Sequence, residues 1–293
     1  MNVAPQPAER MARWSLTTGV AVLALKLGAW RASDSVALLS DALESTVNVA
    51  AAAVMLAAVR VARRPPDRDH PYGHGKAEYL SAALEGLLIT VAAVADVVVA
   101  VDRFAHPRPL EAVGAGVAVS VVASTLNAVL AWRLIAAGRR HRSPALTADG
   151  RHVLSDVVTS AGVIVGVSLA WATGLWWLDP ALACVVAVNI LWMGWKLVRR
   201  SVGGLMDEVL DAGEVAEARA VAERATKEGG GLAVRGFRLR RAGPAGHCDI
   251  ILLVPGSMPV RDAHAIADRV EAALRGWDEL LDVVVHVEPA DDL

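Results

Sequence analysis

Two groups of ionisable and amide side chains lie within long apolar stretches of this sequence. In chain order, their members are Asp41, Glu44, Asn48, Asp149, His152 and Asp156. Spacings of three and then four residues place each group on one face of a helix, over about two turns. If the stretches cross a membrane, each ionisable group costs roughly 2.5–3.5 kcal/mol on insertion scales. Such groups are therefore expected to carry function.

Four of these side chains together resemble the ligand set of a divalent metal ion. Glu44 and Asp156 offer carboxylates, Asn48 an amide oxygen and His152 an imidazole. Zn²⁺ accepts nitrogen and oxygen ligands in a tetrahedron, and the same set suits Fe²⁺, Co²⁺, Mn²⁺ or Cd²⁺ less selectively. The alternative is hydrogen bonding between helices, which Asn and Asp side chains provide without any metal. Either role would bring the two groups together.

The two groups match each other at an offset of 108 residues, since Glu44 corresponds to His152 and Asn48 to Asp156. This match suggests an internal repeat of the kind common in transporters. Counted from opposite membrane surfaces at 1.5 Å per residue, Glu44 and His152 each lie about 15 Å deep. Both positions then fall near the middle of a bilayer core of about 30 Å, which favours the metal site. Asp41 and Asp149, one turn earlier, could support the ligands or pack the helices.

A third group lies in the polar segment 65–78. Asp67, His70 and His74 carry ligand-type side chains at close spacing. The alternative is a solvated polar loop. We expect a second metal site here.

The whole chain divides by composition into two parts. Of its 293 residues, 55% are hydrophobic and 20% are charged, and its two cysteines exclude a disulfide scaffold or a Cys-type zinc finger. Residues 1–202 have a net charge of +5 and residues 203–293 a net charge of −7. We expect a transmembrane transport domain over 1–205 and a cytoplasmic C-terminal domain over 206–293. The acidic tail argues against nucleic-acid binding.

The first domain is expected to contain six transmembrane helices in the lipid bilayer. The predicted spans are 14–31, 36–59, 79–101, 112–132, 157–178 and 180–195. The alternative is that the three spans with charges are buried helices of a soluble protein. Arg and Lys concentrate before span 1, between spans 2 and 3, between spans 4 and 5, and after span 6, so both termini should be cytoplasmic. We expect no signal peptide, because polar residues 1–13 lead directly into a full-length span.

The second domain has the pattern of a small α+β fold. Helical periodicity is expected over 211–227 and 259–275, and strands over 233–241, 248–254 and 281–288. The order α-β-β-α-β predicts one sheet covered by helices.

Three of the segments above resemble the cation diffusion facilitator family. They are Ser40-Asp41-Ala42-Leu43-Glu44, the core His70-x-x-Gly-His-Gly-Lys-x-Glu78, and His152-x-x-x-Asp156. The resemblance covers nearly the whole chain. It implies a homodimeric metal/proton antiporter with six spans per subunit and a metallochaperone-like cytoplasmic domain, in the plasma (inner) membrane of a bacterium.

The resemblance also assigns roles residue by residue. The family's transport site corresponds to Glu44, Asn48, His152 and Asp156, and its loop site to Asp67, His70 and His74. The pair that links the two subunits in the family corresponds to Lys76 and Asp207. The family's metal ligands in the cytoplasmic domain are only partly present here, at His264, His286 and Glu288. Glu44 and Asn48 depart from the commoner His or Asp followed by Asp.

We therefore expect export of Zn²⁺, or of Fe²⁺, Co²⁺, Cd²⁺ or Mn²⁺, in exchange for protons by alternating access. The metal ion is the substrate, and no prosthetic group is expected. A rival interpretation is a membrane metal sensor that does not transport. A metal-dependent hydrolase within the membrane is disfavoured, because the sequence has no His-Glu-x-x-His motif.

Overall fold

The computed structural model describes residues 7–33, 36–105, 115–175, 177–208 and 212–290. The chain divides into two compact units, residues 1–202 and 203–293.

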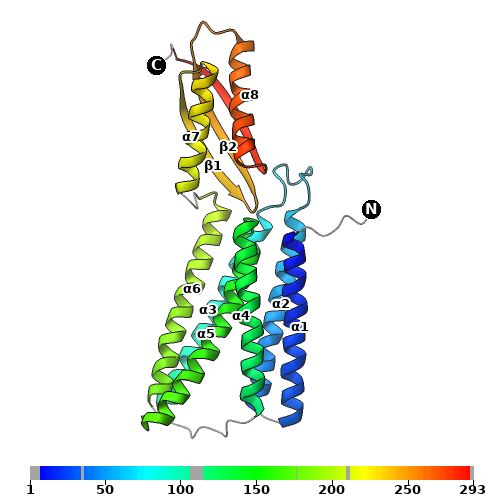
Figure 1. The fold of residues 1–293 in the computed structure, drawn as a ribbon, viewed down its shortest axis with the longest axis vertical. Helices are drawn as coiled ribbons and strands as arrows, with labels where there is room; N and C mark the ends of the chain where they lie inside the picture. The colour runs from blue at the N-terminus through cyan, green and yellow to red at the C-terminus, as the bar shows by residue number, and fades with distance from the viewer. Residues whose placement is uncertain (1–6, 34–35, 106–114, 176, 209–211, 291–293) are drawn as a thin grey trace, which may run out of the picture. The chain divides into compact units, whose positions relative to one another are not determined.

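The first unit consists of six long helices (Figure 1). They are α1 (Pro7–Ser33), α2 (Val36–Ala62), α3 (Ala77–Ala105), α4 (Ala115–Arg140), α5 (Pro144–Thr173) and α6 (Leu178–Leu205). Each predicted span falls largely on one of them. The helical character predicted for this part of the chain is therefore confirmed.

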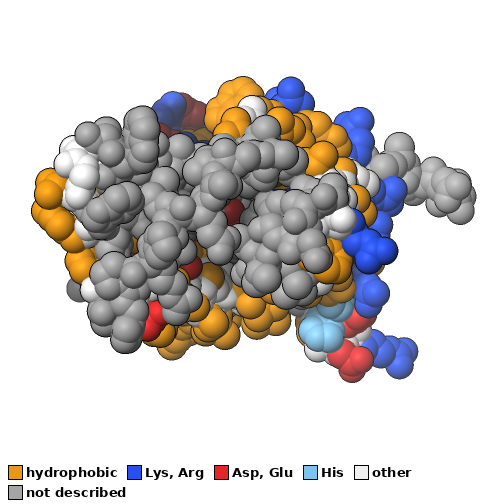
Figure 2. Space-filling view, turned by 90° about the horizontal axis from the view of Figure 1, so that it is seen from below, with side chains coloured by type: hydrophobic (Ala, Val, Ile, Leu, Met, Phe, Trp, Pro, Cys, Tyr) orange, Lys and Arg blue, Asp and Glu red, His pale blue; other side chains and the backbone are white. Residues whose placement is uncertain are grey.

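Four of these helices are long and apolar enough to cross a membrane, within the described residues. The qualifying segments are Ser45–Ala62, Ala77–Asp102, Val121–Arg140 and Ala181–Leu205. The other two helices, α1 and α5, carry more of the charged and polar side chains. Large hydrophobic side chains such as Val98 and Val185 are more than 60% exposed. Figure 2 shows hydrophobic side chains along the flanks of the molecule, as a lipid-facing surface requires.

Helix α5 differs in its bounds from the charge-free run that predicted it. Ser143 caps its N-terminus, with the side-chain hydroxyl accepting from the backbone N–H of Leu146, and Pro144 opens the first turn. At the other end, Gly174 adopts a left-handed conformation with φ of 70° and ends the helix. The predicted span 157–178 thus extends past the observed helix. A run of residues without charge does not show where a glycine ends the helix.

Helices α4 and α5 approach each other closely through glycines. A side chain at Gly150 of α5 would meet Leu134 and Ile135 of α4 at 2.8–3.0 Å. Around this contact, Met55, Leu134 and Leu146 belong to one buried core cluster shared by α2, α4 and α5. This packing holds the first two turns of α5 in place.

The second unit has the predicted α-β-β-α-β order. Its elements are α7 (Ala212–Gly229), β1 (Ala233–Ala242), β2 (Ala245–Val254), α8 (Val260–Trp277) and β3 (Leu281–Pro289). Strand β1 pairs antiparallel with β2, and β2 pairs parallel with β3, so β2 is the central strand. Helix α8 makes the crossover that a parallel pair needs. The predicted N-cap of α7, Asp211, lies outside the described residues.

The core of this unit is apolar. Helix α8 buries Ile266, Val270 and Leu274 at helical spacing, and they pack with strand residues such as Ile250 and Leu252. Beside this core, Arg241 contacts Asp278 at 2.6 Å and also pairs with Glu214. Burial lowers the pKa of Arg241, but its hydrogen bonds to these two carboxylates outweigh this effect, so the pKa is raised overall.

Candidate metal centre

The two polar groups predicted on α2 and α5 meet in the structure. The Asn48 Nδ2 amide donates a hydrogen bond of 2.6 Å to Asp156 Oδ2, although the residues lie 108 positions apart. These positions also correspond in the internal repeat. The amide and the carboxylate therefore hold each other, and both have an oxygen to offer a cation.

His152 lies one turn before Asp156 on α5 and is buried. Its Nδ1 lies 2.6 Å from Oε2 of Glu85, a buried residue of α3. Sequence reasoning assigned no role to Glu85. Its presence within a predicted span was the signal that could have found it, because a carboxylate there needs a partner.

Asp149 occupies the turn of α5 before His152. Its Oδ2 accepts a hydrogen bond of 2.6 Å from the Ser15 hydroxyl of α1. Asp149 was expected either to support the metal ligands or to pack the helices, and this contact between α1 and α5 supports the packing role.

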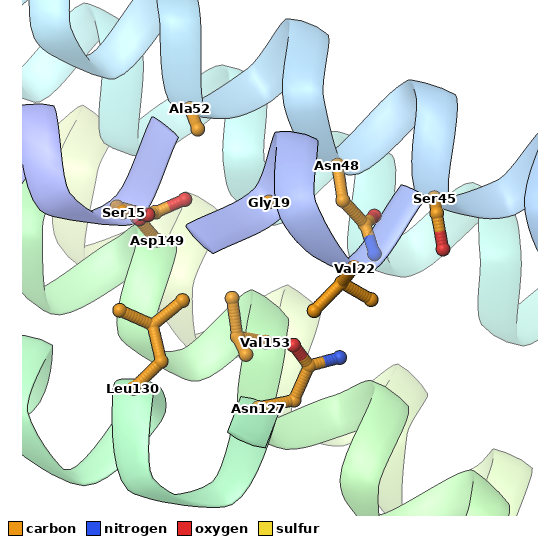
Figure 3. Close-up of a pocket in the computed structure, with 10 residues that line it drawn as sticks. All are labelled: Ser15, Gly19, Val22, Ser45, Asn48, Ala52, Asn127, Leu130, Asp149 and Val153. Atoms are coloured by element: carbon orange, nitrogen blue, oxygen red, sulfur yellow. The ribbon is translucent and has the colours of Figure 1, made fainter. Parts of the chain in front are cut away.

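A small cavity borders these residues (Figure 3). Its volume is about 20 Å³, and Ser15, Asn48, Asn127 and Asp149 give it polar walls. A cavity of this size and polarity has room for a single water molecule. It connects the surroundings of Asn48 with those of Asp149.

The side chains of Asp41 and Glu44 lie outside the described residues. The backbone of α2 places Glu44 one turn before Asn48. Its predicted role as a ligand stays a prediction.

A second carboxylate of α3 fixes the start of α5. Buried Glu78 accepts a hydrogen bond from the hydroxyl of Ser143, the N-cap of α5. Negative charge near a helix N-terminus is favourable, since the unpaired N–H groups and the helix dipole point there. Helix α5 is thus tied to α3 at Glu78 and again at Glu85.

The loop group is assembled as its spacing predicted. Ligand-type atoms of Asp67, His70 and His74 all lie within 4.8 Å of one another. Asp67 Oδ1 accepts backbone hydrogen bonds from Asp69 and His70, at 3.0 and 2.7 Å. Asp67 Oδ2 lies 3.3 Å from His74 Nε2. The backbone hydrogen bond from His70 and the two neighbouring imidazoles lower the pKa of Asp67, so this carboxylate is charged at neutral pH.

The three predicted tail ligands are placed differently. His286 Nε2 lies 3.7 Å from Glu288 Oε1, but the other oxygen of Glu288 lies 2.8 Å from Arg235 Nη1. His264 is exposed on α8 and lies 3.7 Å from Asp268. Burial raises the pKa of the Cys248 thiol to about 12, so Cys248 is not a ready thiolate ligand.

The two residues of the predicted subunit link belong to different units of the chain. Within its own unit, Asp207 Oδ1 lies 3.3 Å from Nη1 of Arg240. Lys76 ends the loop before α3. The link between subunits stays a prediction.

These features define a multi-span membrane protein with a polar, carboxylate-containing site among α2, α3 and α5. Comparison with known proteins identifies the class further. A family model described as the cation efflux transmembrane domain matches residues 13–206, and the cation efflux protein cytoplasmic domain matches residues 211–290. The chain belongs to the cation efflux, or cation diffusion facilitator, family.

The chain is similar to several individual proteins. The uncharacterized transporter sll1263 of Synechocystis sp. is 41% identical over 95% of this chain and 89% of its own length. The cation-efflux pump FieF of Klebsiella pneumoniae is 31% identical over 92% of this chain and 89% of its own length. A solved structure of CzrB in its zinc form is 36% identical over 30% of this chain and 97% of that chain, with a TM-score of 0.28.

The family membership confirms several predictions. The protein is a cation efflux transporter, not an enzyme, and metal cations are its substrates. It is an integral membrane protein with a cytoplasmic C-terminal domain.

Proposed function

We propose that this transporter exports a divalent metal ion, with Zn²⁺ as the favoured substrate, in exchange for protons. Fe²⁺, Co²⁺, Cd²⁺ and Mn²⁺ are the competing substrates. The observation that carries the proposal is the hydrogen bond between Asn48 and Asp156, with His152 one turn away. It joins α2 and α5 at the positions where the sequence predicts a shared ligand set.

In this proposal the metal is bound by Glu44, Asn48, His152 and Asp156. Metal binding requires a neutral imidazole and a deprotonated carboxylate, so protons compete with the ion. Histidine is suited to this exchange because it ordinarily titrates near neutral pH. Protons entering from outside would displace the ion there, and their release to the cytoplasm would restore the site.

The transport cycle is proposed to be alternating access within a homodimer. Residues 1–205 would carry the transport pathway and residues 206–293 the cytoplasmic domain, with Lys76 and Asp207 linking the subunits. Asp67, His70 and His74 would bind a second metal ion near the membrane surface. The bacterial origin of the relatives supports a plasma (inner) membrane location.

The test is metal flux in proteoliposomes with an imposed pH gradient. His152→Ala and Asp156→Ala should each abolish Zn²⁺ flux, because each removes a ligand, while the purified dimer stays folded. The matched controls are His141→Ala in the turn before α5 and Asp96→Asn on an exposed part of α3, which should keep wild-type flux.

Two outcomes would contradict the proposal. Wild-type flux in either site variant would exclude the assigned site. Metal binding without flux in the wild type would favour a metal sensor instead.

A further inference from the structure

The imidazole of His152 forms a close polar contact with α3, a helix that contributes none of the four proposed ligands. Glu85 Oε2 of α3 lies 2.6 Å from His152 Nδ1, and the exposed fractions of the two side chains are 2% and 8%. Two ionisable groups so buried must satisfy each other. The contact is therefore a defined hydrogen bond in the protein interior.

This bond determines which imidazole nitrogen can bind a metal. A neutral imidazole has one N–H donor and one lone pair, on opposite ring nitrogens. With Nδ1–H donating to Glu85, the lone pair is on Nε2. Metal-binding histidines commonly donate their other N–H to a carboxylate, which fixes the ring and makes the ligand nitrogen more basic.

A second glutamate of α3 also contacts α5. Glu78 and Glu85 are seven residues apart and share one face of α3. Glu78 contacts the N-cap of α5, and Glu85 contacts His152 in the third turn of α5. Helix α3 therefore holds the His152 imidazole through Glu85 and the N-terminus of α5 through Glu78.

We propose that Glu85 is a positioning residue for the metal substrate. It accepts the hydrogen bond from Nδ1 of His152 and holds Nε2 as the metal ligand, so α3 joins α2 and α5 in building the transport site. This inference rests on the proposed function, since it assigns His152 as a ligand.

The first experiment measures Zn²⁺ flux against Zn²⁺ concentration in proteoliposomes. Glu85→Ala should raise the KM about 10- to 100-fold, the usual effect of losing such a carboxylate. Glu85→Gln should recover much of this loss, because its amide oxygen still accepts from Nδ1–H. Asp96→Asn, which removes a carboxylate from the same helix, should keep the wild-type KM.

The flux experiment separates positioning from a structural role. If Glu85 serves only the fold, Glu85→Ala lowers the melting temperature and the maximal flux but leaves the KM unchanged. An unchanged KM in Glu85→Ala would overturn the inference. Absence of flux in the wild type would instead overturn the proposed function.

The second experiment tests whether Glu85 acts through His152. Zn²⁺ affinity is measured by calorimetry on the full chain with His70 and His74 changed to Ala, which removes the loop group. In this background Glu85→Ala should weaken binding when His152 is present and have no further effect when His152 is Ala. A further loss of tenfold or more in the His152→Ala protein would make Glu85 a metal ligand itself and overturn the positioning role. This measurement decides the role even if the wild type does not transport.

Discussion

At the scale of single residues, Asn48 is the unusual member of the proposed site. The commoner residue at its position in the family is Asp, so this site has two carboxylates where three would otherwise stand. In the structure the Asn48 amide also donates to Asp156, which an Asp side chain could not do in its charged form. Position 48 therefore affects both the charge of the site and the way Asp156 is held without metal.

We predict that Asn48→Asp raises Mn²⁺ flux relative to Zn²⁺ flux. The added carboxylate favours hard cations, which depend most on anionic oxygen, and it replaces a hydrogen bond with repulsion that a bound cation relieves. Competition flux at fixed pH is the measurement. Asn127→Asp adds a carboxylate to the same cavity without changing a proposed ligand, so it should leave the ratio at the wild-type value. An unaltered Mn²⁺/Zn²⁺ ratio in Asn48→Asp would show that selectivity is decided elsewhere.

At the scale of elements, α5 is the helix on which the site depends. It carries His152 and Asp156, and four neighbours restrain it: α1 through Ser15, α2 through Asn48, α3 through its two glutamates and α4 through close glycine packing. Gly150 lies on this helix two residues before His152. A shift of α5 at Gly150 would therefore move the ligands.

Gly150→Ala should destabilise the protein and reduce flux. The new Cβ would lie 2.8 Å from Ile135 Cγ1, 2.9 Å from Leu134 Cβ and 3.0 Å from the Ile135 backbone nitrogen. Overpacking of this kind costs about 1–3 kcal/mol, and the backbone contact cannot move aside easily. Thermal unfolding in detergent and Zn²⁺ flux measure the two effects.

The control for this prediction is Gly28→Ala on α1. Apart from the adjoining backbone of α1 itself, no heavy atom of the described residues lies within 4 Å of a Cβ at this position. Stability and flux should therefore stay near wild type. Equal losses in the two variants would mean that helix glycine content, and not the α4/α5 contact, is responsible.

At the scale of the whole molecule, the cytoplasmic domain has its own stabilising core. Val270 and Leu274 of α8 are fully buried against the sheet, and Arg241 bridges Asp278 and Glu214. Nothing in this core depends on the predicted tail ligands His264, His286 and Glu288. The domain should therefore fold without metal.

We predict that chelation with EDTA leaves the cytoplasmic domain folded in the full-length protein. Hydrogen exchange of the β1, β2 and β3 amides should stay protected, because the sheet hydrogen bonds are buried under α8. Arg241→Met serves as a positive control, since it removes the buried guanidinium that binds Asp278 and Glu214 and should cost about 3–5 kcal/mol. Exchange that becomes fast on chelation alone would show that metal is required for folding.

Local sequence determined much of this protein. Apolar run length predicted helices α1 to α6, and alternating and helical periodicities predicted every element of the tail to within a few residues. The loop group was predictable because Asp67, His70 and His74 are close in sequence. The 108-residue offset also placed Asn48 and Asp156 in one proposed ligand set, and the structure brings the two side chains together. These features depend on neighbours along the chain or on a repeat, which the sequence shows directly.

Tertiary structure decided which buried polar groups satisfy each other. Glu85 lies 67 positions from His152, and Ser15 lies 134 positions from Asp149. No periodicity encodes these pairs, because they depend on how each helix is rotated and on how closely glycines let α4 and α5 approach. The span predicted over 157–178 also extended past the end of α5, because Gly174 in a left-handed conformation ends the helix. The sequence alone determined the types of the proposed ligands. Packing between helices decided how His152 is held, since that requires a partner from a helix that only folding brings near.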